Sequence, residues 1–242
     1  MRPLLLLGLV ALAGCEQNLG APDAGAPDAG HPISAALLGC ASEPGNPLTS
    51  IAGVVGRVNA LPHPVGGPCF VASLARPLAV VATTGTITPQ PAGGPHDPRI
   101  FIMAPGVVIA VVSAGPGAKA IEMGEWVSAT QTLKGEIALP VTQPLPTDDP
   151  LTRLETDGGV GTACGMCHRY EAPHGSSAHG YVSAAFRPKP PTDVKLEALA
   201  AEHQACITSG EVSERCDMFH ALFDFGAITP GAFAKEVEYF IQ

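Results

Sequence analysis

The sequence predicts an α+β protein: a β-rich sandwich or barrel-like domain over residues 33–145, then a small all-α domain over residues 146–242. Three observations lead to this fold class. Residues 33–145 consist of short apolar, β-branched runs separated by Gly and Pro, which is typical of antiparallel strands. Residues Pro144–Gly161 are polar and loop-like, which indicates a boundary. Beyond them, apolar residues recur at helical spacing.

The composition excludes several classes of protein. Of the 242 residues 46% are hydrophobic and 14% are charged, so the chain can bury a core. Thirteen Lys and Arg against 22 Asp and Glu give a net charge of −9, which argues against a nucleic-acid partner. No coiled coil, collagen or polytopic membrane protein has this composition.

Residues 1–14 and the cysteine after them are expected to form an export signal. Arg2 precedes a short apolar stretch, and Leu12-Ala13-Gly14-Cys15 follows, which resembles a bacterial lipoprotein signal with lipid on Cys15. An ordinary secretory signal with a chance cysteine is the alternative. Residues 15–32 repeat Ala-Pro-Asp-Ala-Gly twice and predict a flexible tether. We therefore expect a lipid-anchored protein facing the periplasm, with Glu16 favouring the outer membrane over the inner one.

Within residues 33–145, the spacing of Ile51, Val54, Val55, Val58 and Leu61 predicts an amphipathic helix over residues 50–61. The other apolar runs predict strands at Phe70–Leu74, Leu78–Thr83, Ile100–Met103, Val107–Val112, Lys119–Met123, Trp126–Thr130 and Glu136–Val141. No catalytic spacing stands out among them, so the role of this region stays open.

Residues 146–242 predict three helices. Apolar positions recur at helical spacing over 194–208 and over 212–224, where Gly226 gives a stop signal. Thr229-Pro230 is a good start for a last helix, because Thr caps a helix and Pro suits its first position.

The chain has seven cysteines, and export would place them in an oxidising compartment. Besides Cys15 and a Cys-x-x-Cys pair, four remain. They allow three pairings, of which we prefer Cys40–Cys69 with Cys206–Cys216 because each stays within one expected domain.

Residues Cys164-Gly165-Met166-Cys167-His168 form the motif C-x-x-C-H, the sequence signal for covalent attachment of c-type haem. The two thiols add to the two haem vinyl groups, and the histidine that follows binds the iron from one side. The motif therefore predicts one covalent haem c.

The motif, together with the length and helicity of residues 160–242, resembles a monohaem c-type cytochrome. The resemblance implies that Cys164 and Cys167 form the thioether bonds and that His168 is the proximal ligand. The family commonly supplies a distal Met further on, which points to Met218. That family places the Met in a loop beside proline, whereas Met218 falls in a predicted helix. His203, on the apolar face of its helix, is a second candidate, and water, an open position or another group is the third alternative.

Three other interpretations of the motif remain. A thioredoxin-type dithiol would need a βαβ setting that the sequence does not show. A zinc site could combine Cys164 and Cys167 with one or two of His168, His174 and His179, although the spacing is irregular. The third is a plain Cys164–Cys167 disulfide in a domain without haem.

The sequence as a whole favours a lipid-anchored periplasmic cytochrome that exchanges single electrons with other periplasmic redox proteins. We expect an electron carrier rather than an enzyme. The alternative function is a cell-envelope binding or assembly lipoprotein in which Cys164 and Cys167 form a structural disulfide and no haem is bound.

Overall fold

The structure is a computed structural model that describes residues 33–41, 45–157, 160–175 and 179–240. The predicted signal at 1–14, Cys15 and the predicted tether at 15–32 lie outside these residues. The main element is a nine-stranded mixed sheet with the order β10-β1-β2-β3-β4-β5-β7-β6, in which β9 also pairs with β1.

The centre of the sheet is an antiparallel meander. Its strands are β1 (Leu78–Thr83), β2 (Arg99–Met103), β3 (Val107–Val112), β4 (Ala120–Trp126) and β5 (Gln131–Ala138). Side chains alternate between the two faces of a strand. In β2, Ile100 and Ile102 are buried in the core, whereas Arg99 and Phe101 on the other face are half-buried. This second face carries the pocket described below.

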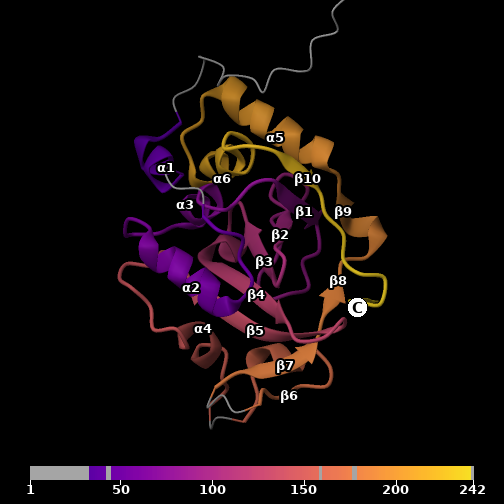
Figure 1. The fold of residues 1–242 in the computed structure, drawn as a ribbon. Coiled ribbons are helices and arrows are strands. Elements are labelled where there is room, and N and C mark those ends of the chain that lie inside the picture. Colours follow the sequence, from indigo (N-terminus) through magenta and orange to yellow (C-terminus); the bar gives the residue numbers. More distant parts are fainter. Residues whose placement is uncertain (1–32, 42–44, 158–159, 176–178, 241–242) are drawn as a thin grey trace, which may run out of the picture.

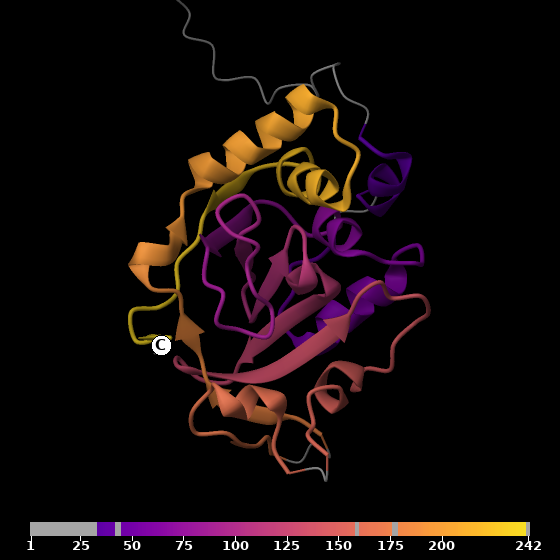
Figure 2. The same ribbon diagram turned by 180° about the vertical axis from the view of Figure 1, so that it is seen from behind.

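Helices cover the core face and one end of the sheet (Figures 1 and 2). α2 (Ile51–Ala60) contacts β4 through its buried side, and Ser50 caps it by accepting a hydrogen bond from the Gly53 amide. The short α4 (Asp149–Thr152) contacts β5. At the other end lie four helices: α1 (Ala35–Cys40), α3 (Gly67–Ala72), α5 (Leu196–Ser209) and α6 (Glu214–Phe223).

The part of the chain beyond residue 145 adds strands to the same sheet. These are β6 (Ala172–Pro173), β7 (Tyr181–Ala184), β9 (Asp193–Val194) and β10 (Ile228–Pro230). A separate two-stranded sheet joins β8 (Phe186–Arg187) to β11 (Glu238–Tyr239). Short 3-10 turns complete the chain at Pro116–Lys119, Ala163–Met166 and Pro190–Thr192.

The predicted fold class is therefore wrong. No small all-α cytochrome c-like domain follows a separate sandwich or barrel, because β7 pairs with β5 and β10 pairs with β1 in one continuous sheet. Strands of two to four residues are too short to show a hydrophobic period, and their partners lie far away in the sequence.

Several predicted elements are confirmed and others are corrected. β1 and β3 match their predicted ranges, and α2, α5 and α6 form close to theirs. Phe70–Leu74 lies largely in α3 rather than in a strand, because Gly66 and Pro68 start a helix there. The last predicted helix is replaced by β10 and β11, since Ile228 pairs in parallel with Leu78 of β1.

Both preferred disulfides are formed. Cys40–Cys69 joins α1 to α3, and Cys206–Cys216 joins α5 to α6. Together they tie the helices at one end of the sheet. Among the described residues, no helix has the length and apolar character needed to cross a membrane.

Candidate functional site

The C-x-x-C-H motif occupies a tight turn beside the polar face of the sheet. Thr162 opens the turn at Ala163–Met166 by accepting a hydrogen bond from the Cys164 amide at 3.1 Å. The Glu171 carboxylate accepts hydrogen bonds from the Thr162 amide at 2.8 Å and from its hydroxyl at 2.5 Å. The His168 amide donates to the Cys164 carbonyl at 2.8 Å, which closes the turn.

The turn needs a glycine at its second motif position. A Cβ on Gly165 would lie 2.5 Å from the nearer Glu171 carboxylate oxygen, which is well inside van der Waals contact. Both motif cysteines are free thiols, with Cys164 half-buried and Cys167 exposed. The local structure therefore presents two unbonded sulfur atoms three positions apart.

His168 is held as a neutral imidazole. Its Nδ1 lies 2.6 Å from the Ala184 carbonyl oxygen, and its ring stacks on Phe186 with centroids 5.2 Å apart. Burial lowers the pKa of His168 to about 4, and the nearby Lys134 ammonium acts in the same direction. At neutral pH Nδ1 donates its proton to the carbonyl, so Nε2 keeps the lone pair that a metal needs.

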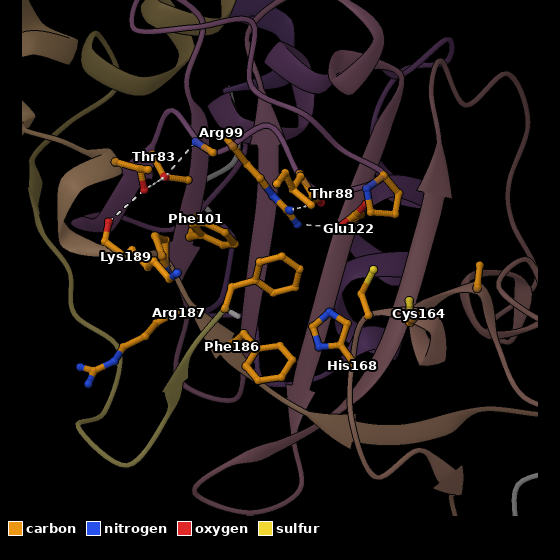
Figure 3. Close-up of a pocket in the computed structure, with 18 residues that line it drawn as sticks. Thr83, Thr88, Arg99, Phe101, Glu122, Cys164, His168, Phe186, Arg187 and Lys189 are labelled. Atoms are coloured by element: carbon orange, nitrogen blue, oxygen red, sulfur yellow. Dashed lines mark hydrogen bonds and ion pairs between the residues drawn. The ribbon is translucent and has the colours of Figure 1, made fainter. Parts of the chain in front are cut away.

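A hollow of about 930 Å³, including its open mouth, adjoins the motif (Figure 3). Cys164 and His168 lie together on one side of it, and Phe101 of β2 lies across from them. Phe186 of β8 and Phe240, near the end of the chain, add aromatic surface, and their rings meet edge to face at 5.6 Å. A hollow lined mainly by apolar and aromatic side chains, with a few polar groups, is typical of a ligand site.

Three cations, Arg99, Arg187 and Lys189, line the same hollow. Arg99 lies over the ring of Phe101, with 4.9 Å from the guanidinium carbon to the ring centre, and its guanidinium binds the Glu122 carboxylate at 2.5 Å. These cations favour a ligand that is apolar in its body and acidic at its edge.

Lys134 lies close to the motif, and the sequence analysis missed it. It is 8% exposed, and its Nζ donates to Thr132 Oγ1 at 2.6 Å and to the Ala184 carbonyl at 3.3 Å. The same carbonyl contacts His168. Burial lowers the pKa of Lys134 to about 8. The only sequence signal is its place on the polar face of an alternating strand.

The environment of Cys164 does not suit a reactive thiolate. Burial raises the pKa of the Cys164 thiol to about 11, and the Glu122 carboxylate adds to this effect. Nucleophilic cysteines of dithiol oxidoreductases have pKa values below the ordinary one. The geometry therefore disfavours a thioredoxin-type reaction.

The two candidate distal ligands are not brought to His168. Met218 is buried in α6, where its Cε lies 3.1 Å from the position that a Cβ on Gly67 would occupy. His203 of α5 contacts Asp224 and stacks on Phe223 with ring centres 5.1 Å apart. Neither lines the hollow.

Of the histidines in the zinc alternative, His168 lies beside the thiols, whereas His174 and His179 do not line the same hollow. His179 pairs with Glu155 at 2.9 Å, and its neighbour His174 is held by a backbone hydrogen bond to Gly180. Within the described residues, the metal-type group of three ligands consists of other side chains and does not include Cys164 or Cys167.

Comparisons of this chain with protein-family models, with curated proteins and with solved structures found no match.

Proposed function

We propose that this protein binds one covalent haem c through Cys164, Cys167 and His168, and carries single electrons while anchored by lipid on Cys15. One observation carries the proposal. A neutral imidazole, with Nδ1 fixed by the Ala184 carbonyl, and two free thiols open onto the same aromatic hollow.

Each part of the site has a definite role in this proposal. Cys164 and Cys167 would hold the haem through its two vinyl groups, and His168 Nε2 would hold the iron. When bound, the haem supplies a one-electron Fe(III)/Fe(II) couple. The aromatic side chains Phe101 and Phe186 exclude water from the macrocycle, which raises the energetic effect of nearby charges.

The cations around the hollow fit the acidic edge of a haem. Arg187 and Lys189 provide positive charge for the propionates, whereas Arg99 is already paired with Glu122, which also lines the hollow. Lys134 adds a partly buried positive charge beside the axial histidine. A positive charge close to the iron stabilises the reduced state, so this arrangement favours a raised reduction potential.

The pKa of Cys164 supports this proposal over a dithiol oxidoreductase. A dithiol oxidoreductase requires a stabilised thiolate, whereas burial raises the pKa of Cys164. The alternative against which the haem proposal is tested is an envelope-binding lipoprotein that carries no haem.

The test is the visible spectrum of the exported Cys15→Ser protein, produced together with c-type maturation factors. We expect a reduced α-band that remains with the polypeptide after denaturation and acid extraction, at one haem per chain. Cys164→Ser with Cys167→Ser should abolish covalent attachment, and His168→Ala should change the spectrum of the haem that remains attached.

The matched controls are His203→Ala and Met218→Leu, which alter the former distal candidates. Because neither residue lines the hollow, both variants should keep the covalent haem and its spectrum unchanged. A colourless protein, or one whose colour is lost on denaturation, would contradict the proposal and favour the envelope-binding function.

A further inference from the structure

The end of the sheet covered by α5 and α6 carries a second group of metal-ligand side chains, distinct from the C-x-x-C-H motif. His203, His220 and Asp224 place one ligand atom each within 4.8 Å of the others. Their side chains are 14%, 6% and 18% exposed, so the group is nearly buried but retains a path to solvent.

The disulfide between α5 and α6 positions the two histidines. His203 lies one helical turn before Cys206 on α5, and His220 lies one turn after Cys216 on α6. Since residues three or four apart share a helix face, the disulfide Cys206–Cys216 directs both imidazoles into the same gap. Their rings lie 5.2 Å apart, edge to face. Asp224 follows at the end of α6, one turn after His220.

Asp224 contacts both histidines, one with each carboxylate oxygen. Oδ2 lies 2.6 Å from His220 Nδ1, and Oδ1 lies 2.8 Å from His203 Nε2. The contact between Asp224 Oδ1 and His203 Nε2 lies outside hydrogen-bond geometry. Within the described part of the chain, His203 Nε2 is therefore a buried nitrogen without a hydrogen-bond partner. A buried unsatisfied nitrogen facing a carboxylate is typical of a position where an ion belongs.

The carboxylate is suited to bind a cation. Burial alone would raise the pKa of Asp224, but its contacts with His203 and His220 outweigh this effect and lower the pKa below the usual value. The group therefore offers one carboxylate and two imidazoles as ligands.

We infer that His203, His220 and Asp224 form a binding site for a borderline divalent metal ion of the zinc class, with a fourth position open to water. Two imidazoles and one carboxylate are a common donor set for zinc. Bonds of about 2.0–2.2 Å in tetrahedral geometry place neighbouring ligand atoms about 3.3 Å apart. The three ligand atoms already lie within 4.8 Å of one another, so small side-chain movements bring them to this spacing. This inference does not depend on the proposed haem.

Two other histidine–carboxylate pairs provide an internal comparison. His96 contacts Glu202 at 2.6 Å, and His179 contacts Glu155 at 2.9 Å. Their histidine side chains are 75% and 39% exposed, and neither pair belongs to a three-ligand group among the described residues. Each of these pairs also combines an imidazole with a carboxylate, but neither has a buried third ligand among the described residues.

The test is a titration with Zn²⁺ in competition with a chromophoric chelator, on the Cys15→Ser protein in two forms. The first carries covalent haem, which occupies the motif thiols. The second is the haem-free Cys164→Ser/Cys167→Ser variant, which keeps the result separate from the outcome of the haem experiment. We expect one zinc ion per chain in both forms, and Co²⁺ should give the visible spectrum of a four-coordinate site.

His203→Ala should weaken zinc binding more than about 100-fold, because even outer partners of metal ligands contribute 10–100-fold. Asp224→Asn, which keeps the size and polarity of the side chain, should also weaken zinc binding. This variant provides the test if His203→Ala fails to fold. His96→Ala and His179→Ala should leave the affinity unchanged. Absence of stoichiometric binding, or binding that survives both His203→Ala and Asp224→Asn, would overturn the inference.

Discussion

Replacing Lys134 by methionine tests the energetic cost of the charge buried beside the C-x-x-C-H motif. The ammonium is 8% exposed, and burial lowers its pKa from 10.5 to about 8. Methionine has a similar length and no charge, so Lys134→Met removes this cost while keeping most of the volume. We expect the variant to be the more stable protein at pH 7.

The magnitude follows from the pKa difference. About 2.5 pKa units at 1.36 kcal/mol each correspond to about 3 kcal/mol. Below pH 8 the lysine is protonated in both states, and the folded protein bears the full cost. Between pH 8 and 10.5 the folded state has released the proton while the unfolded state still holds it, so the free energy of unfolding of the wild type rises with pH. Above pH 10.5 the lysine is neutral in both states, so the free energy of unfolding no longer contains a penalty for burying its charge.

The assay is urea unfolding followed by circular dichroism, in the haem-free Cys164→Ser/Cys167→Ser background. The Lys134→Met variant should have a higher free energy of unfolding than the protein that keeps Lys134. This difference should shrink by up to about 3 kcal/mol from pH 7 to pH 10.5. Lys119→Met is the matched control, because the Lys119 side chain is 67% exposed and its replacement removes no buried charge. A difference for Lys134 that stays constant or grows with pH would refute the reasoning.

Three further predictions follow from other contacts. Removing the disulfide Cys206–Cys216, which has a sequence separation of 10, should lower the free energy of unfolding in urea by about 3 kcal/mol. Removing Cys40–Cys69, which has a separation of 29, should lower it by about 4 kcal/mol. Arg76→Met should cost about 3 kcal/mol in the same assay, because this buried guanidinium donates to two carbonyls near the end of α6 at 2.5 and 2.7 Å. In the haem-loaded protein, added imidazole should convert the spectrum to low spin, since no methionine and no second histidine line the described hollow.

These three predictions have clear contrary results. Equal or negligible losses for the two disulfides would contradict the loop-length reasoning. A neutral Arg76 variant would show that water replaces the two hydrogen bonds without cost. A haem that is already low-spin without added ligand would mean that a side chain reaches the iron from outside the described lining.

The sequence predicted elements whose signal is local. The β-branched runs Leu78–Thr83 and Val107–Val112 became β1 and β3, and the helical spacing in residues 194–208 and 212–224 became α5 and α6. The last predicted helix failed because its capping signal at Thr229-Pro230 is outweighed by pairing with β1, about 150 residues earlier. Pairing between segments so far apart in the chain produces no periodic pattern of apolar residues in the sequence.

The candidate site was predictable only as far as its motif. The spacing of Cys164, Cys167 and His168 predicted haem attachment from the sequence alone, and the structure brings these three residues to one hollow. Lys134 and Phe186 could not be found, because what places them beside His168 is the shared Ala184 carbonyl and a stacking contact between distant segments. The disulfide pairings were predicted because each keeps both of its cysteines on one side of the expected boundary near residue 145, and both pairings are formed.

The strand order has a consequence for how the protein reaches its native state. The outer side of β1 is covered by β10 over Leu78–Val80 and by β9 over Ala82–Thr83, while β7 covers the outer side of β5. Until the last quarter of the chain has docked, the central meander has two unpaired edges, which are templates for aggregation. Pairing over such long separations is also slow. The central meander is therefore exposed to aggregation before these strands dock, and a chain truncated before residue 228 should accumulate as insoluble material.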